Sequence, residues 1–109
     1  MIGKRKEDML LAFNKMKEIG GGIVLAEDGK IIFEMKLSLA GLMSDLRLED
    51  LAQETETLKD LLMERGYPFT DPIYSLLFFS ATHLPYIRVT QSGLYDVMNK
   101  KVLFPTLMR

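Results

Sequence analysis

The chain has 109 residues, of which 48% are hydrophobic and 27% charged, and its formal net charge is -1 at pH 7. Proteins that bind nucleic acid generally carry a clustered excess of Lys and Arg, so this charge balance argues against a nucleic-acid partner. Cysteine is absent, which excludes disulfides, thiolate metal ligands and thiol nucleophiles and is compatible with the cytoplasm.

No apolar segment approaches the length of a membrane span, and the first stretch, MIGKRKEDMLLAF, is interrupted by charges too early for a secretory signal. We therefore expect a soluble, cytoplasmic protein with no membrane partner. Chains of this length usually form one domain, so residues 1–109 are expected to fold as a single domain with a modest core.

The first predicted element is an amphipathic helix over Lys6 to Ile19, where apolar residues recur at helical spacing. The run Gly20 to Gly22 follows, and a glycine just after the last periodic residue is typical of a left-handed helix C-cap. A phosphate-binding loop is disfavoured, because such a loop follows a strand and opens a helix, whereas this run follows a helix and precedes a strand.

Two extended segments, between residues 23 and 37, are joined by Asp28-Gly29. This pair tolerates positive φ at both central positions of a tight turn and predicts an antiparallel hairpin. Hydrophobic and charged residues alternate along the second strand, which predicts one buried and one wet face. The first face holds Ile31, Phe33, Met35 and Leu37, and the second holds Lys30, Glu34 and Lys36.

A second amphipathic helix is predicted between Leu48 and Leu62, with Ser44 or Asp45 as its N-cap and Gly66 after its end. Its apolar stripe consists of Leu48, Leu51, Ala52, Thr55, Leu58 and Leu62.

The last third of the chain is less regular. Ile73 to Ala81 is an apolar segment whose period does not distinguish a helix from a strand. Tyr86 to Thr90 and Leu94 to Met98 are predicted strands around a turn at Ser92-Gly93, and residues 101–107 form a candidate edge strand. The predicted fold class is α+β, a small, mainly antiparallel sheet with helices packed on one face.

Residues that could support metal or acid–base chemistry are scarce. His83 is the one histidine, and its apolar neighbours favour a place at the rim of the core or at an interface. The acidic residues of the second helix lie away from the apolar stripe, which favours a solvated surface over a cation site; they include Asp50, Glu54, Glu56, Asp60 and Glu64. We expect no catalytic residue and no metal ligand in this chain.

The segment LSLAGLMSD, residues 37–45, is unusually apolar for a loop. In one interpretation Leu39, Leu42 and Met43 fold back over the sheet and close the core, while Gly41 permits the turn. In the other, the loop is apolar because something outside this chain covers it. Taken alone, the residues slightly favour the first interpretation.

Several blocks together resemble one known family. GGGIVLAEDGKIIFEMKLSLAGLMSD, LEDLAQETETLKDLL, DPIYSLLFFS, IRVT and GLYDV occur in this order over about residues 7–97. In this order and spacing they are similar to the C-terminal domain of bacterial adenine deaminases of the amidohydrolase superfamily. Ser38, where that family commonly has proline, the segment ATHLPY and the extension MNKKVLFPTLMR depart from it and suggest the adenine deaminase-like branch.

The resemblance implies a larger parent enzyme that hydrolyses adenine to hypoxanthine and ammonia. Its barrel domain would hold a pair of divalent metal ions, manganese or iron, with ligands that this sequence does not contain. The chain would be a fragment of that enzyme, inactive by itself, with the barrel as its partner. Because a domain separated from its barrel would expose apolar surface, we also expect it to self-associate into a homo-oligomer. The resemblance also favours a role for the loop of Gly41, Leu42, Met43, Ser44 and Asp45 in binding substrate or contacting the barrel.

Two other functions remain open at this point. The chain could be an independent, separately encoded module that binds a protein or a small ligand. It could also be a small metal-independent enzyme, which the single histidine and the lack of cysteine disfavour.

Overall fold

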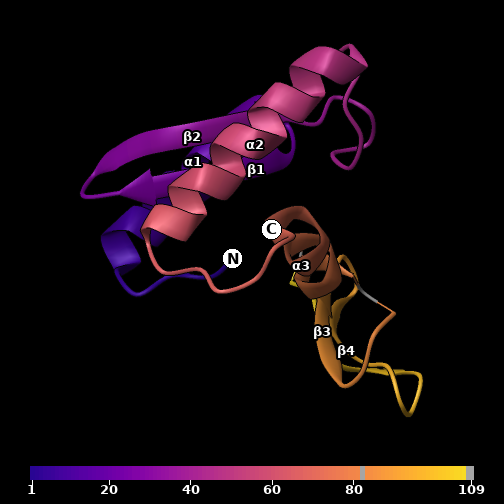
Figure 1. Cartoon of the computed structure of the whole chain (residues 1–109). Helices are drawn as coiled ribbons and strands as arrows, with labels where there is room; N and C mark the ends of the chain where they lie inside the picture. The colour runs from indigo at the N-terminus through magenta and orange to yellow at the C-terminus, as the bar shows by residue number, and fades with distance from the viewer. Residues whose placement is uncertain (82, 108–109) are drawn as a thin grey trace. The chain divides into compact units, whose positions relative to one another are not determined.

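A computed structural model describes residues 1–81 and 83–107. Thr82, in the segment ATHLPY, and residues 108–109, in the C-terminal extension, lie outside the described residues. Within the described part the fold class is α+β, as predicted, with three helices and two antiparallel sheets (Figure 1). The chain forms two compact units, Met1–Pro68 and Phe69–Arg109, and each is described by itself.

The first unit begins with helix α1, Lys6–Ile19, over the range that the sequence predicts. Gly20 ends it in the left-handed conformation, with φ 78°, and donates its backbone N–H to Met16 O. Near its start, Asp8 accepts a hydrogen bond of 2.8 Å from the backbone N–H of Gly29. The first turn of α1 is therefore fastened to the turn of the hairpin that follows.

The hairpin consists of β1, Gly22–Glu27, and β2, Lys30–Lys36, paired antiparallel. Asp28 and Gly29 take φ values of 50° and 76°, as a tight turn with two positive φ angles requires. This confirms the predicted hairpin. The pairing register shifts between Leu25 and Ala26, a bulge that the alternation of residue types does not reveal.

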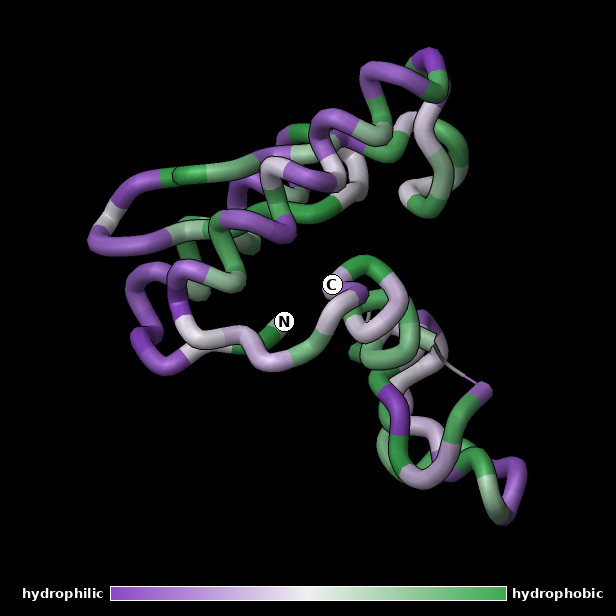
Figure 2. Tube along the Cα trace, viewed as in Figure 1, coloured by the Kyte–Doolittle hydropathy of each residue, from purple (hydrophilic) through white to green (hydrophobic). Residues whose placement is uncertain are grey.

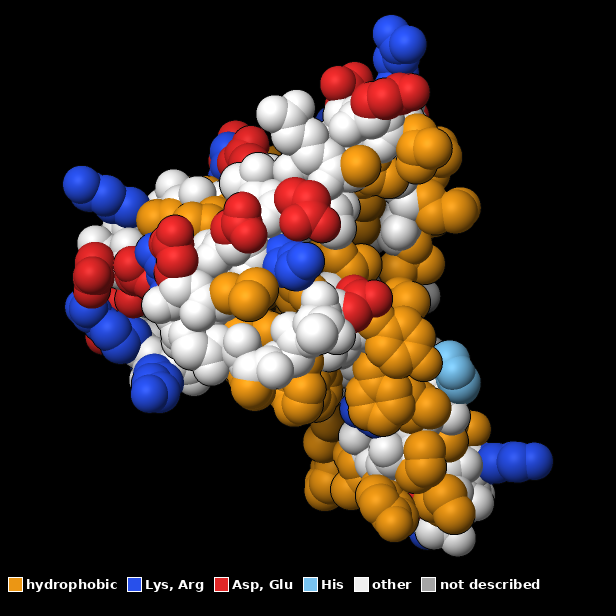
Figure 3. Space-filling view, viewed as in Figure 1, with side chains coloured by type: hydrophobic (Ala, Val, Ile, Leu, Met, Phe, Trp, Pro, Cys, Tyr) orange, Lys and Arg blue, Asp and Glu red, His pale blue; other side chains and the backbone are white. Residues whose placement is uncertain are grey.

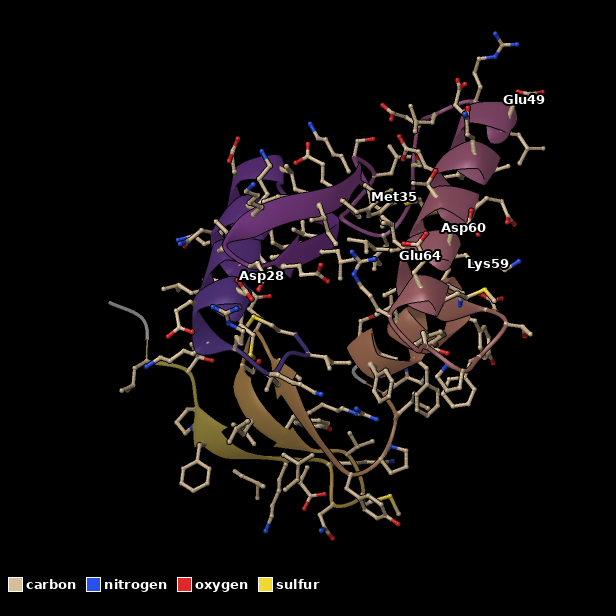
Figure 4. The ribbon with its side chains drawn as sticks, turned by 60° about the vertical axis from the view of Figure 1, so that its left-hand side comes forward. Asp28, Met35, Glu49, Lys59, Asp60 and Glu64 are labelled. Carbon is tan, nitrogen blue, oxygen red and sulfur yellow. The ribbon has the colours of Figure 1, made fainter. Side chains whose placement is uncertain are left out.

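The predicted alternation along β2 is present. Phe33 and Met35 are buried, whereas Lys30, Glu34 and Lys36 are exposed. Helix α1 reaches the charged side through Lys15, whose Nζ lies 3.3 Å from a carboxylate oxygen of Glu34. Met35 lies between β2 and the second helix (Figure 4).

Helix α2, Leu48–Glu64, supplies the most buried side chain described, Leu58, which is 1% exposed. Figure 2 shows hydrophilic and hydrophobic residues interleaved along it, as in an amphipathic helix. Its N-terminus differs from the prediction, because Arg47 occupies the N-cap position without a capping side-chain hydrogen bond. Ser44 lies too far upstream, and its Oγ instead accepts the N–H of Leu46 at 3.1 Å. Since α2 starts only at Leu48, neither Ser44 nor Asp45 can cap it.

The C-terminal end of α2 is joined to the hairpin by an ion pair. Arg65, the C-cap residue, donates from its guanidinium to both carboxylate oxygens of Glu27 at the end of β1, with Nη2 to Oε1 at 3.1 Å. The hydrogen bonds from Arg65 lower the pKa of the Glu27 carboxyl below its usual value. A two-pronged contact of this kind fixes the direction in which α2 leaves the hairpin.

The second unit contains helix α3, Pro72–Ser80, which decides the segment that the sequence left open. Asp71 caps it by accepting the N–H of Tyr74 at 2.9 Å, and Pro72 occupies the first turn. Proline at this place costs no hydrogen bond and has a φ suited to a helix. The dipeptide Asp71-Pro72 was therefore the signal for a helix.

A three-stranded antiparallel sheet completes the second unit, in the order β3-β4-β5. Its strands are β3, Ile87–Thr90, β4, Gly93–Asp96, and β5, Lys101–Pro105. All three predicted strands exist. The turn lies one residue earlier than predicted, because Gly93 already belongs to β4, where it pairs with both Thr90 and Pro105.

Candidate interface loop

The segment that links β2 to α2 forms a turn closed by its own backbone. Leu39 donates its N–H to Met43 O at 2.9 Å, and Met43 donates its N–H back to Leu39 O at 3.1 Å. Ala40 and Gly41 between them have φ values of 57° and 72°. We call residues 39–45 the apolar loop; its first half is a defined structure rather than a loose connection.

The apolar loop touches the glycine run that follows α1. A Cβ atom built on Gly21 would lie 2.7 Å from the Cα of Gly41, closer than real Cβ atoms approach such an atom. Gly21 also accepts the backbone N–H of Leu37 at 3.2 Å. The close approach is thus made between two backbone segments of this chain. Gly21, which the sequence analysis assigned to the helix cap and the entry of the strand, therefore also supports the apolar loop.

The side chains of the apolar loop point away from the core. Leu39 is 49% exposed, Leu42 64% and Met43 61%, and Figure 3 shows hydrophobic side chains projecting beside the N-terminal end of α2. The interpretation that these residues close the core is therefore wrong. Contiguous exposed apolar side chains usually mark a surface that another protein segment covers.

Polar groups near the apolar loop are few. Ser44 is half-buried, and because its Oγ accepts from Leu46, its hydroxyl proton is still available to a partner. Asp45 is exposed. The structure thus places the five predicted site residues, Gly41 to Asp45, in one continuous loop that offers two apolar side chains, a hydroxyl and a carboxylate.

Other parts of the described chain offer little chemistry. Over residues 1–81 and 83–107 there is no group of three or more His, Asp or Glu side chains that could hold a metal ion. His83 is exposed on the surface (Figure 3), so the predicted place at the rim of the core is wrong, while the alternative, a place at an interface, stays a prediction. A hollow of about 400 Å³ along α1 is mainly apolar; it is lined by Met1, Lys4, Lys6, Met9, Leu10 and Phe13.

One acidic residue of α2 does not fit the predicted solvated surface. Glu54 is half-buried, and its Oε2 is enclosed without a hydrogen-bond partner in the described structure. Glu54 lies one helical turn from Leu58, on the buried side of α2. Separately, no described helix combines the length and apolar character needed to cross a membrane.

Comparison with known proteins identifies the chain's relatives. The "Putative adenine deaminase YerA" of Bacillus subtilis (strain 168) is 61% identical over 108 residues, which are 99% of this chain and 19% of that protein. BH0637 of Halalkalibacterium halodurans, which has the same designation, is 55% identical over 100% of this chain and 19% of its own length. The "Adenine deaminase" of Kosmotoga olearia is 38% identical over 91% of this chain and 17% of its own length.

These relatives are much longer than the chain, which spans about a fifth of the length of each. The family model described as "Adenine deaminase C-terminal domain" matches residues 1–101. This match covers the whole first unit with its apolar loop, and the second unit as far as the first residue of β5. The chain therefore belongs to the adenine deaminase C-terminal domain family.

Proposed function

We propose that this chain is the C-terminal accessory domain of a metal-dependent adenine deaminase, an enzyme that hydrolyses adenine to hypoxanthine and ammonia in the cytoplasm. The family match and the names of the relatives support this proposal. The main support is the difference in length between this chain and its relatives. Nearly all of the chain aligns with YerA and BH0637, named above, but it covers only 19% of each of them. The catalytic region would therefore lie in another part of the parent protein.

The chain's residues do not fit a metal site. It has one histidine and no cysteine, and its described acidic side chains form no cluster of ligands. Two metal ions activating water need several histidine and carboxylate ligands. The manganese or iron ions of the parent would therefore be bound by its amidohydrolase barrel, which makes this chain by itself inactive.

The apolar loop is the proposed point of contact with the barrel. Leu42 and Met43 project as two neighbouring apolar side chains from a turn that its own hydrogen bonds hold. Such a turn loses little conformational entropy when it is covered. Ser44 adds a hydroxyl donor that can reach a barrel loop or a bound purine.

The contact is tested by Met43→Ser with Ser44→Ala in the full-length protein. Met63→Ser is a matched control, since Met63 is a similarly exposed methionine, 54%, on α2. We expect the loop variant to lower kcat/KM for adenine or the Tm of the catalytic region, and the control to change neither. If activity, metal content and Tm all match those of the control, the loop has no role at this interface.

The exposed apolar loop also favours a second candidate, an independent protein-interaction or small-ligand-binding module. That candidate predicts that the 109-residue chain is stable alone and binds its ligand without a catalytic region.

Sedimentation of the full-length protein additionally tests the proposed homo-oligomer, whose interface would include more than one copy of this domain.

A further inference from the structure

The second unit exposes an apolar sheet face. Residues opposite each other in an antiparallel sheet point to the same side, and Val89 pairs with Leu94, which pairs in turn with Phe104. Ile87 lies two residues before Val89 and shares its side, as does the half-buried Asp96, which pairs with Ile87 at the end of this side. We call the four apolar side chains the β3–β5 apolar face; Ile87 is 56%, Val89 80%, Leu94 37% and Phe104 68% exposed.

Strand β3 is inverted relative to an ordinary half-buried strand. Its apolar residues Ile87 and Val89 are exposed, while Arg88 and Thr90 between them are half-buried. In a water-facing sheet the polar residues would be outside. The inversion indicates that another protein segment covers the exposed side of β3.

Hydrogen bonds fix this orientation. Arg88 donates from Nε to Leu84 O at 3.0 Å and from Nη2 to Pro85 O at 2.9 Å. Thr90 donates from Oγ1 to Gly93 O at 2.9 Å. Because a slip of one residue would turn every side chain of β3 to the opposite side and break these bonds, the register holds the apolar residues outward.

The second unit has almost no apolar core of its own in the part that the structure describes. Pro72 is its one buried residue there with an apolar side chain, whereas the buried side chains of the core, Phe33, Met35 and Leu58, all belong to the first unit. A folded unit of about 40 residues without a buried core, a disulfide or a metal is expected to be unstable alone. We therefore expect the second unit to be folded only while another protein segment covers its apolar side chains.

We infer that the β3–β5 apolar face docks on the part of the parent chain that lies outside residues 1–109. A family described as a C-terminal domain places that part before this chain, and it accounts for about four-fifths of each relative's length. A cover in the same chain is present at high effective concentration in every copy. A second copy would instead depend on protein concentration.

This inference rests on the proposed function only in naming the cover as the deaminase's catalytic region. The docked face would form a permanent interface, apolar like a divided core. It is separate from the apolar loop, which lies in the other compact unit, so loop variants and face variants test different contacts.

Photo-cross-linking in the full-length protein tests the inference. Phe104→p-benzoylphenylalanine places the probe on the face, and Lys100→p-benzoylphenylalanine places it in the exposed turn between β4 and β5 as a matched control. Protein prepared as a mixture of ¹⁴N- and ¹⁵N-labelled copies distinguishes cross-links within a chain from those between chains. We expect the Phe104 probe to give single-isotope cross-links to the segment preceding this chain, and the Lys100 probe to give none there.

Mixed-isotope cross-links would assign the face to a second copy and overturn the inference. Cross-links confined to residues 1–68, or absent from the Phe104 probe, would overturn it equally. Val89→Asp gives an independent readout, because a carboxylate buried in the docked face should release the second unit. A protease should then cleave within residues 69–107 faster than in the unsubstituted protein. Unchanged cleavage would contradict docking.

Adenine deamination is measured on the same preparations. If the Phe104 probe cross-links as expected but the unsubstituted protein does not deaminate adenine, the docking stands and the proposed function fails. If the unsubstituted protein deaminates adenine but the probe gives no such cross-link, the function stands and the docking fails.

Discussion

Gly21 and Gly41 meet backbone to backbone, and this contact joins the segment after α1 to the apolar loop before α2. An added Cβ at Gly21 would come within 2.7 Å of the Cα of Gly41, an atom that cannot rotate away. The position of Leu42 and Met43 thus depends on the absence of a side chain at a residue far from them in sequence.

Gly21→Ala should destabilise the protein more than Gly20→Ala. Both residues have positive φ, 126° and 78°, but an added Cβ at Gly20 has nothing within 4 Å. Gly20→Ala should therefore cost only backbone strain, about 1–2 kcal/mol, whereas Gly21→Ala adds a clash and displaces the apolar loop. Thermal unfolding and protease cleavage at residues 39–45 measure both effects. Equal losses would show that the close approach is unimportant.

The Glu27–Arg65 pair should make stability depend on pH in the acid range. Because the folded pKa of Glu27 is below its ordinary value of 4.5, the pair's contribution is complete above that value and is lost as the pH falls through the folded pKa. Glu27→Gln should consequently lower the Tm at neutral pH and have a shrinking effect below pH 4.5. Glu49→Gln, at a residue 79% exposed, is the control. A pH-independent difference would contradict the assignment.

The cap of α3 predicts a local effect. Asp71→Ala removes the acceptor of the Tyr74 N–H and should cost about 1 kcal/mol. Hydrogen exchange of the α3 amides in the full-length protein measures this loss directly. Asp45→Ala is a useful comparison, since Asp45 caps no helix in the structure, and equally fast exchange in the two variants would refute the cap.

Glu54 offers a test of what surrounds α2. With one carboxylate oxygen enclosed and unpaired in the described structure, Glu54→Met should raise stability by about 1–3 kcal/mol. Glu56→Met, at an exposed residue of the same helix, should change little. If Glu54→Met instead lowers the Tm or the activity, the carboxylate binds a group supplied by another part of the protein.

Local signals made the first unit predictable. The periodicity before Gly20 and the Asp28-Gly29 turn determine α1 and the hairpin through neighbouring residues alone. The N-cap of α2 was wrongly predicted because Ser44 and Asp45 are good caps in isolation, yet Leu46 lies in a bend and Arg47 is extended before the helix begins at Leu48. Capping preference ranks residues but does not determine where the chain turns.

The surfaces that carry the function were harder to predict. Met43 and Val89 have the composition of core residues, and nothing near them in sequence says that they point outward. In the proposed function and the inferred docking, another part of the parent protein covers such side chains. The pattern of apolar residues therefore predicted the strands and the loop, whereas the exposure of their side chains became known only from the three-dimensional structure.

The assignment of this chain as an accessory domain is best tested by the rate of hypoxanthine and ammonia formation from adenine, measured with added manganese or iron. The full-length protein and the 109-residue chain are compared at equal concentration. We expect deamination by the full-length protein and none by the chain alone. Deamination by the chain alone, or none by a folded, metal-loaded full-length protein, would contradict it.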